Sequence, residues 1–351
     1  MPPRKNDALM EMEMTEWDFT TRMPENFFYL VFGKRRSGKT TMMRLISQVL
    51  PFAFTYQHVV IAGSVAIRKL WAKIVHDFYI HDGSDETNIL RVIIDEMQRR
   101  CRVCEHYNVP FPPEWELALY IDDCGSYAKF MHSKEMNWIA SQGRNSHITI
   151  FIMVQKLTQA STECREGADG VMVLYSAFQD SIKALHKEFA SCIKFDQFSN
   201  IHACCTQRKG MLVVDANAEV PTAAGIFGFS HADVLHPDGF KAELKKVGHP
   251  DHWAYAVENY KLPPAPKLNL GEGVIIVQAA GESGNTQTAN VNTPLKQKRA
   301  SGSDSDSSDL DQPFQNSAII PRTSAFQDTS SRVGNLMIRF KRRLNTAKIG
   351  A

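Results

Sequence analysis

The feature that most constrains the fold of this chain is a glycine-rich segment near its start. Residues 33–40 read Gly-Lys-Arg-Arg-Ser-Gly-Lys-Thr and fit the Walker A pattern G-x-x-x-x-G-K-[ST] at every fixed position. The apolar run Phe28–Phe32 precedes this segment, and the helix-prone residues 41–49 follow it. A strand, a glycine-rich turn and a helix in that order predict a phosphate-binding loop.

The chemistry of such a loop assigns roles to its residues. Glycines let the backbone approach phosphate closely, and successive N–H groups at a helix start face the negative charge. Lys39 is expected to neutralise the β- and γ-phosphates of ATP, and the Thr40 hydroxyl is expected to ligate Mg²⁺. The full set expected to hold the nucleotide is Gly33, Lys34, Arg35, Arg36, Ser37, Gly38, Lys39, Thr40 and Thr41.

The rest of the chain up to about residue 263 alternates apolar runs of strand length with helical patterns. This alternation is typical of an α/β domain with a mostly parallel sheet flanked by helices. One such domain is therefore predicted for residues 25–263, after a lead-in of residues 1–24. The expected strands are Phe27–Phe32, His58–Ala62, Leu117–Asp122, Ile148–Val154 and Val171–Tyr175, with a hairpin-like pair at Ile201–Thr206 and Met211–Asp215.

The composition changes after Pro263. Residues 264–330 are rich in Gly, Ser, Thr, Asn, Gln and Asp, and we expect a largely disordered linker with an acidic Ser/Asp patch at 304–311. Residues 331–351 contain no acid and carry basic and apolar residues at helical spacing. That pattern predicts a basic amphipathic helix for DNA, a partner groove or an anionic surface. A solvated tail that folds only transiently is the alternative.

Composition excludes some classes of protein. No run of about 18 apolar residues exists, so no membrane span is expected, and the polar residues 1–6 are unlike a signal peptide. The 7 cysteines are irregularly spaced, which suits a reducing compartment better than a disulfide framework. A formal net charge of +2 neither demands nor excludes nucleic acid as a partner.

Two acidic pairs compete as the Walker B motif, which supplies the carboxylate for Mg²⁺. Asp95 and Glu96 follow an apolar run, but apolar residues recur there at 90, 93, 94, 97, 101 and 104, which is helical spacing. Asp122 and Asp123 instead end an apolar strand and precede a Cys-Gly-Ser turn. A metal-binding carboxylate belongs where a strand ends, so we favour Asp122 for Mg²⁺ and Asp123 as the hydrolytic carboxylate.

Three further residues are candidates for catalysis. Gln155 ends the nearly continuous apolar run 148–154, and its amide either reports on the γ-phosphate or caps the strand. Arg144 precedes that run and Arg165 follows it. Either arginine fits an arginine finger supplied across a subunit interface, and either fits a plain surface position.

In the order of these segments the chain resembles the genome-packaging ATPases of nucleocytoplasmic large DNA viruses and related large DNA transposons. These belong to the FtsK/HerA group of DNA-pumping motors. The resemblance covers roughly residues 25–220 and leaves the tail outside. It depends on residues 33–40, on Tyr-Ile-Asp-Asp at 120–123, on Gly-Arg-Asn-Ser-His-Ile at 143–148, on Gln155 and on Arg165.

This resemblance implies a P-loop NTPase with a RecA-like core, assembly into a homo-oligomeric ring and ATP-driven translocation of double-stranded DNA. It also implies a viral capsid or portal-like vertex protein as a partner. The expected location is the host nucleus or a cytoplasmic virus factory, or the virion. One departure is Asp123, where many motors of the group have Glu.

Other functions fit the same loop less well. A GTPase needs an Asn-Lys-x-Asp motif, which the chain lacks, and no arginine-rich lid of a small-molecule kinase is evident. A nucleotide-binding scaffold and a cellular plasmid or chromosome pump stay open. Cys101, Cys104 and His106 suggest zinc, but no second cysteine pair has matching spacing, so thiols on a helix are favoured.

Overall fold

The computed structural model describes residues 10–23, 25–84, 88–218, 223–260, 330–333 and 336–341. The chain divides into two units, Met1–Tyr260 with Gln327–Ala351, and Lys261–Phe326. The second unit, with the expected acidic patch, lies outside the described residues.

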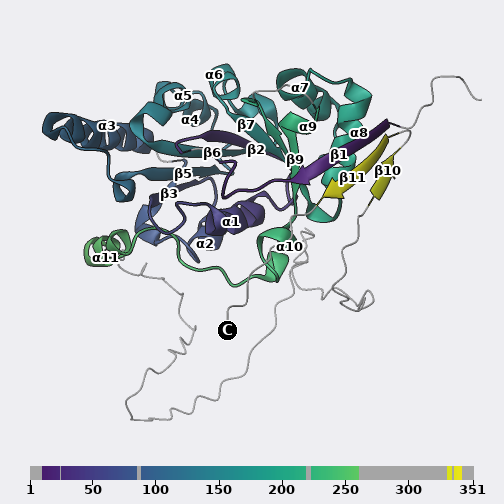
Figure 1. The fold of residues 1–351 in the computed structure, drawn as a ribbon. Coiled ribbons are helices and arrows are strands. Elements are labelled where there is room, and N and C mark those ends of the chain that lie inside the picture. Colours follow the sequence, from purple (N-terminus) through teal and green to yellow (C-terminus); the bar gives the residue numbers. More distant parts are fainter. Residues whose placement is uncertain are drawn as a thin grey trace, which may run out of the picture. The chain divides into compact units, whose positions relative to one another are not determined.

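The described strands join one sheet in the order β10-β11-β1-β9-β8-β7-β2-β6-β5-β3-β4 (Figure 1). From β7 to β4 all neighbours run parallel, whereas β8 runs antiparallel to both β7 and β9. The strands are β1 Met10–Glu16, β2 Phe28–Phe32, β3 Gln57–Ala62, β4 Ile80–Asp82, β5 Leu117–Asp122, β6 Ile148–Val154, β7 Gly170–Val173, β8 Met211–Asp215, β9 Phe227–Ser230, β10 Ser330–Val333 and β11 Leu336–Lys341.

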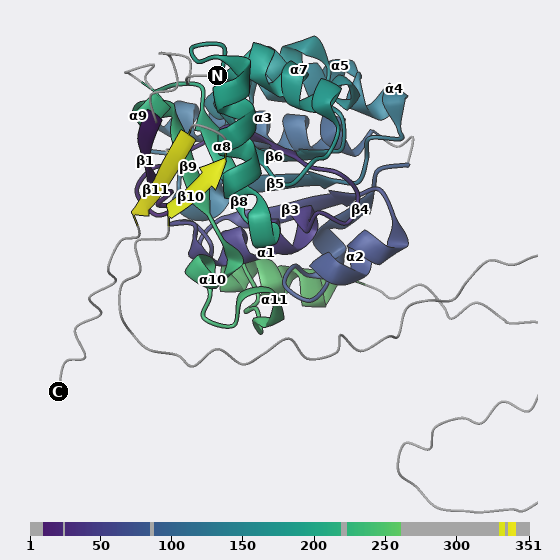
Figure 2. The ribbon, with the colours of Figure 1, turned by 90° about the vertical axis from the view of Figure 1, so that its right-hand side faces the viewer.

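Helices cover both faces of this sheet. In Figures 1 and 2, α1, α2, α10 and α11 lie below it, and α3, α5 and α7 lie above it. The α-helices are α1 Lys39–Val49, α2 Val65–Trp71, α3 Ile89–Tyr107, α4 Ala128–Met131, α5 Lys134–Gln142, α6 Thr162–Glu166, α7 Gln179–Phe189, α8 Phe195–Cys205, α9 Ala223–Ile226, α10 Ala232–Leu235 and α11 Pro250–Asn259. Short 3-10 turns are η1 Asp77–Tyr79, η2 Pro113–Trp115, η3 Arg144–Ser146, η4 Leu157–Gln159, η5 Gln207–Lys209 and η6 Gly239–Lys241.

The centre of the sheet is the core of the domain. Every residue of β2, β5 and β6 is buried, because helices cover both faces of these strands. The register pairs Phe32 with Val154 and Asp122 with Met153, so β2, β5 and β6 end at one edge. That edge is called the carboxyl edge below, and the opposite one the amino edge.

The sequence-based fold is confirmed in its main features. The domain is α/β with a mostly parallel sheet, and the expected central strands agree with β2, β3, β5, β6 and β7 to within two residues at each end. The helical interpretation of residues 90–104 is confirmed as well, since α3 carries Asp95 and Glu96.

The predicted hairpin at Ile201–Thr206 and Met211–Asp215 is wrong in its first half. Residues 201–205 belong to α8, which buries Phe198, Ile201, His202, Cys204 and Cys205. These buried positions have the spacing of one helix face. The strand prediction considered only residues 201–206, the second half of that helix, and so missed the longer helical pattern. Met211–Asp215 is strand β8, but it pairs with β7 and β9.

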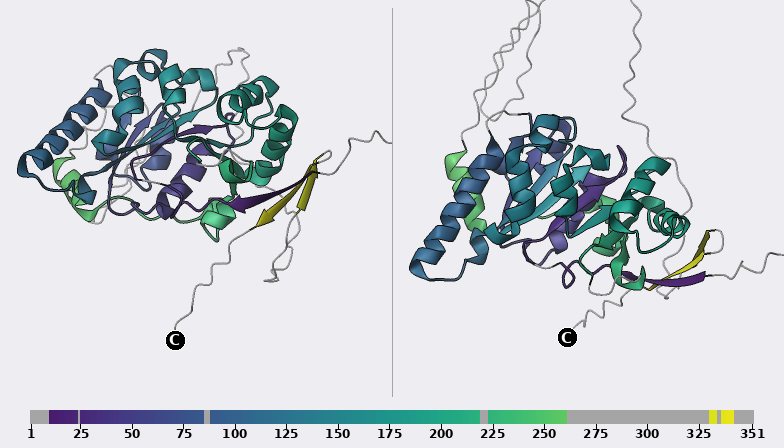
Figure 3. Two further views of the ribbon diagram at one scale, coloured as in Figure 1. Left: turned by 45° about the horizontal axis from the view of Figure 1, so that its top comes forward. Right: turned by 90° about the horizontal axis from the view of Figure 1, so that it is seen from above.

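Both ends of the chain differ from expectation. The predicted basic amphipathic helix over 331–351 is wrong over its described part, where β10 and β11 are strands, and residues 342–351 lie outside that part. In the sequence, apolar and basic residues alternate from Ile338 to Lys341, which favours a strand. The lead-in likewise contains β1, which pairs in parallel with β11 (Figure 3).

Candidate functional site

The glycine-rich loop connects β2 to α1 at the carboxyl edge. The Gly33 N–H donates to the Val154 carbonyl at 3.2 Å, which ties the loop to the end of β6. Gly38 has φ +94°, a conformation that side chains rarely adopt, and α1 starts directly after it. Among the described residues no side chain caps the first turn of α1. Its N–H groups are therefore available to an anion.

The loop itself closes around a small polar cradle. A Cβ on Gly33 would lie 2.6 Å from the Ser37 Oγ, so this close approach requires glycine. Ser37 is 7% exposed, and its Oγ has no hydrogen-bond partner among the described residues. A buried hydroxyl without a partner is costly unless a ligand satisfies it, which fits a bound phosphate.

Lys39 extends over this loop. Its Nζ donates to the carbonyls of Gly33 at 2.7 Å and Lys34 at 3.2 Å. Burial lowers the pKa of Lys39, while the charges of Asp122 and Asp123 oppose that shift. The ammonium is thus hydrogen-bonded to the loop and attracted by two carboxylates, and it offers a phosphate a partly desolvated cation.

Asp122 ends β5 directly opposite the start of α1. It is 2% exposed, and its Oδ2 accepts hydrogen bonds from the Thr40 Oγ1 at 2.7 Å and from the Trp71 Nε1 at 3.0 Å. Burial raises the pKa of Asp122, and the hydrogen bonds from Trp71 and Thr40 and the charge of Lys39 oppose the shift. The loop threonine and this carboxylate are therefore in direct contact.

Sequence reasoning missed Trp71. This side chain is fully buried at the end of α2, 51 residues before the carboxylate that it contacts. A buried indole N–H usually finds a hydrogen-bond partner, so the tryptophan at position 71 is the one signal that the sequence contained.

Asp123 and Gln155 meet beside Asp122. The Gln155 Nε2 donates to the Asp123 Oδ1 at 3.2 Å, and the Gln155 backbone N–H donates to Gln159 Oε1 at 2.7 Å. Asp123 has φ +60°, an uncommon conformation for a non-glycine residue. Thr40, Asp122, Asp123 and Gln155 thus form one group along the carboxyl edge.

A cavity of about 660 Å³ adjoins the loop and Gln155. Three cations line it, Lys34 and Arg35 from the loop and Lys156 from the turn after β6, together with Gln155 and the exposed Phe178. The loop therefore has a cationic surface in addition to Lys39.

The two arginine candidates lie away from this group. Arg144 precedes β6 at the amino edge, and its Nη1 lies 2.5 Å from the buried Oδ1 of Asp169. Arg165 pairs with Glu188 at 3.3 Å, and its Nη1 donates to the carbonyls of Leu157 and Ala160. Neither arginine reaches the loop of its own chain.

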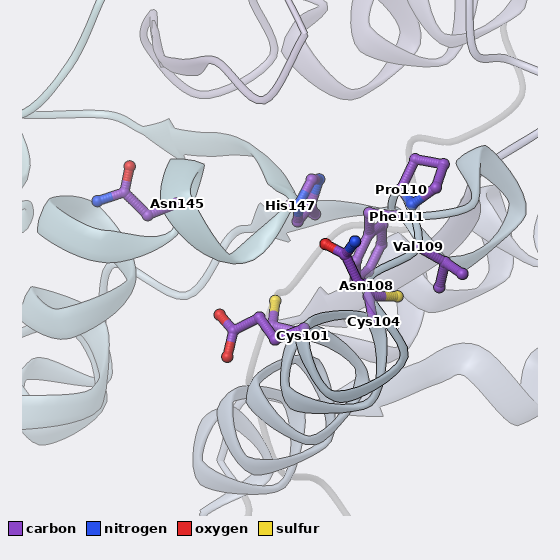
Figure 4. Close-up of a pocket in the computed structure, with 9 residues that line it drawn as sticks. Cys101, Cys104, Asn108, Val109, Pro110, Phe111, Asn145 and His147 are labelled. Atoms are coloured by element: carbon purple, nitrogen blue, oxygen red, sulfur yellow. The ribbon is translucent and has the colours of Figure 1, made fainter.

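A second cavity, of about 430 Å³, lies at the amino edge, the same edge as Arg144 (Figure 4). Cys101 and Cys104 reach it from α3, and Phe111 and His147 come from the segments before β5 and β6. The two rings stack at 3.8 Å between centroids. Within the described residues no group of three or more His, Cys, Asp and Glu side chains is arranged to hold a metal ion.

The carboxyl edge fits Mg²⁺ and a nucleoside triphosphate. A hydroxyl and a carboxylate are oxygen ligands of the kind that Mg²⁺ binds, and here they share one hydrogen bond. The cradle of Gly33 and Ser37 and the ammonium of Lys39 suit phosphate oxygens. Strand, glycine-rich loop and helix at this edge of a mostly parallel sheet are the P-loop NTPase fold.

No protein-family model matches the chain. Uncharacterized protein 015R of Frog virus 3 (isolate Goorha) is 24% identical over 190 residues, which are 53% of this chain and 55% of that relative. The match thus spans about half the length of the curated relative.

The solved structures that match the chain include a viral genome-packaging NTPase. NTPase B204 of Sulfolobus turreted icosahedral virus 2, in complex with ATP-gammaS, is 10% identical with a TM-score of 0.40, over 59% of this chain and 97% of that chain. EssC (ATPases 2 and 3) from Geobacillus thermodenitrificans is 13% identical with a TM-score of 0.39, over 46% of this chain and 34% of that chain. Within the described ranges, no helix combines the length and the apolar character of a membrane span.

Proposed function

We propose that the chain is an ATPase that moves double-stranded DNA and packages a viral genome into a preformed capsid. The observation that carries the ATPase part is the contact of the phosphate loop with the β5 carboxylate: Thr40 donates to Asp122, which is buried beside Lys39. Burial of Asp122 and partial burial of Lys39 and Asp123 are costly, and a bound nucleotide with its metal offsets that cost.

In this proposal each residue of the group has one task. The loop from Gly33 to Thr41 binds the triphosphate of ATP, and Lys39 neutralises charge that develops on the transferred phosphoryl group. Asp123 accepts a hydrogen bond from the attacking water and so polarises it. The Gln155 amide orients the Asp123 carboxylate through a hydrogen bond of 3.2 Å.

Thr40 and Asp122 are the residues that would hold Mg²⁺, which supplies Lewis-acid stabilisation of phosphate charge. Trp71 keeps the Asp122 carboxylate in place through its indole N–H. Burial excludes water from this carboxylate, so its interaction with a cation is stronger than in solution.

The DNA and packaging parts depend on the order of motifs shared with the packaging ATPases, and the match to a protein of Frog virus 3 supports a viral source. In a homo-oligomeric ring, a neighbouring subunit would place an arginine against the phosphate. Arg144 and Arg165 are the two sequence-based candidates for it. The further proposed partners are double-stranded DNA and a capsid or portal-like vertex protein, met in the host nucleus, in a cytoplasmic virus factory or in the virion.

ATP turnover by the purified 351-residue chain, with and without double-stranded DNA, tests this function. We expect turnover that DNA stimulates, and a loss of about a hundred-fold or more in Lys39→Ala, since one phosphate contact in the transition state is removed. Lys73→Ala changes an exposed lysine of the same type and should leave turnover unchanged.

The outcomes separate the candidate functions. Full turnover in Lys39→Ala contradicts the nucleotide site itself. ATP binding without turnover favours a nucleotide-binding scaffold, and turnover that DNA does not change contradicts translocation. A cellular plasmid or chromosome pump would give the same DNA stimulation, and binding to capsid protein distinguishes the packaging motor from it.

A further inference from the structure

An aromatic ring from near the C-terminal end of the domain sequence packs against the phosphate loop. Phe240, in η6, lies so close to the loop that a Cβ on Gly38 would be 3.5 Å from its Cε1 and 3.6 Å from its Cζ. Gly38 is the residue directly before α1. The ring is half-buried, so part of its surface is open to a ligand.

The sheet topology explains how this ring reaches the loop. Because β8 runs antiparallel to β7, the residues just before β8 lie at the carboxyl edge, and Val173 pairs with Leu212 there. The end of β9 lies at the same edge, since Ser230 pairs with Met211, and α10 and η6 follow β9. Figures 1 and 2 both show α10 beside α1.

The segment after Phe240 is anchored to its surroundings by backbone hydrogen bonds. Gln48, near the end of α1, exchanges two hydrogen bonds with the backbone of Lys245, at 2.9 and 3.1 Å. The Val247 N–H donates to the Ile74 carbonyl, and the Gly248 N–H donates to the Ala53 carbonyl. The ring is thereby held in a fixed place relative to the helix that starts at the phosphate loop.

One face of the Phe240 ring already accepts a cation. The Lys209 Nζ lies 5.0 Å from the ring centroid, and Lys209 is exposed. An exposed cation–π contact is weak, whereas stacking of a base on an aromatic ring is stronger. A planar base can therefore replace the ammonium on this face.

The position of the ring indicates which part of a bound nucleotide it contacts. Asp122, Asp123 and Gln155 lie on the β5 and β6 side of β2, where the terminal phosphate belongs. Phe240 and Lys209 belong to segments adjoining β8 and β9, on the opposite side. The base is joined to the α-phosphate through a single ribose, so it must lie close to the loop and away from the terminal phosphate.

We infer that Phe240 is the platform on which the nucleobase stacks, in the place now taken by the Lys209 ammonium. This inference rests on the proposed nucleotide site and assigns its base-binding part. Stacking is tolerant of base identity, so the ring contributes affinity for the nucleotide and little discrimination between purines.

Binding of two probes to the full chain tests the platform. Mg²⁺–ADP contains a base, and inorganic triphosphate with Mg²⁺ does not. Phe240→Leu should weaken Mg²⁺–ADP binding by roughly ten-fold or more and leave triphosphate binding unchanged, while Phe240→Trp should restore Mg²⁺–ADP binding. Unchanged triphosphate binding also shows that the variant is folded and that its loop is intact.

Tyr175 provides a matched control. It is a partly exposed aromatic residue just after β7, and Lys34 lies over its ring at 4.6 Å. Tyr175→Leu should leave Mg²⁺–ADP affinity unchanged. Equal Mg²⁺–ADP affinity in Phe240→Leu and the wild type overturns the inference, as does a loss confined to Tyr175→Leu. A wild-type chain that binds neither probe instead overturns the nucleotide site on which the inference rests.

Discussion

At the amino edge of the sheet a buried carboxylate is saturated by its own chain, whereas at the carboxyl edge buried polar groups have capacity left for a ligand. Asp169, which is 3% exposed, accepts hydrogen bonds from the Phe28 N–H, Arg144 and Asn217. At the other edge the Ser37 hydroxyl has no partner within the described chain, and the Lys39 ammonium donates to two carbonyls of its own loop.

This difference separates structure from function within one sheet. A saturated buried network stabilises the fold, because each of its groups has exchanged water for a protein partner. A buried carboxylate and an unpaired buried hydroxyl beside a partly buried lysine are typical of a site that awaits its ligand. Changes at the carboxyl edge should therefore affect turnover, and changes at the amino edge should affect stability.

The largest effect is expected from Asp123→Asn. The amide cannot polarise the attacking water, so kcat for ATP should fall by about a hundred-fold or more while ATP still binds. Steady-state turnover and calorimetric ATP binding measure the two quantities. Near-normal turnover would place the hydrolytic carboxylate elsewhere, and loss of ATP binding would mean that Asp123 acts in binding.

The second effect should appear at the amino edge. Asp169→Ala removes the acceptor of the buried Phe28 N–H and the partner of Arg144, so the free energy of unfolding should fall by about 2–3 kcal/mol. Denaturant unfolding measures this change. Turnover per folded molecule should stay normal, and a stable but inactive variant would break the comparison between the edges.

Arg144→Ala sharpens the same test. The side chain is half-exposed, so a smaller loss of stability, about 1 kcal/mol, is expected. If this variant instead lost turnover with its stability intact, Arg144 would act as the arginine finger of a neighbouring subunit.

A smaller effect is expected from Trp71→Phe, which removes a hydrogen-bond donor from Asp122. That hydrogen bond lowers the carboxyl pKa and so opposes burial, which raises it. Without it the pKa rises further, Asp122 is protonated at a higher pH, and Mg²⁺-dependent turnover should be lost earlier on acidification. The pH profile of kcat/KM measures this shift.

Trp115→Phe is the control, since Trp115 lies in η2, just before β5 at the amino edge. Its profile should match the wild type. If the acid limb of the kcat/KM profile were unchanged in Trp71→Phe, the role of Trp71 would be limited to packing.

Whether the sequence could predict a feature of the fold or the site depends on how far apart in the chain the interacting residues are. The loop and the ends of β5 and β6 are local patterns, so residues 33–40, Asp122 and the strands around them were placed from the sequence alone. Trp71 and Phe240 were missed, because each acts on a residue far away in the chain, at Asp122 and Gly38. No local period records such contacts.

The errors have a related cause. The two mispredicted segments are short, and residues outside each segment decide whether it forms a helix or a strand. They are residues 201–206 and 336–341. The first belongs to a longer helical face, and the second pairs with β1 from the other end of the chain. Pairing of that kind adds to the local alternation of residues 338–341 in favour of a strand.

Calorimetric titration of ATP into the full chain, with and without Mg²⁺, tests most directly whether Asp122 faces the metal of a loop-bound nucleotide. Mg²⁺ should tighten ATP binding in the wild type and in Asp95→Asn, whose carboxylate lies on the surface of α3. In Asp122→Asn that tightening should disappear. A full Mg²⁺ effect in Asp122→Asn, or its loss in Asp95→Asn, would contradict the site described here.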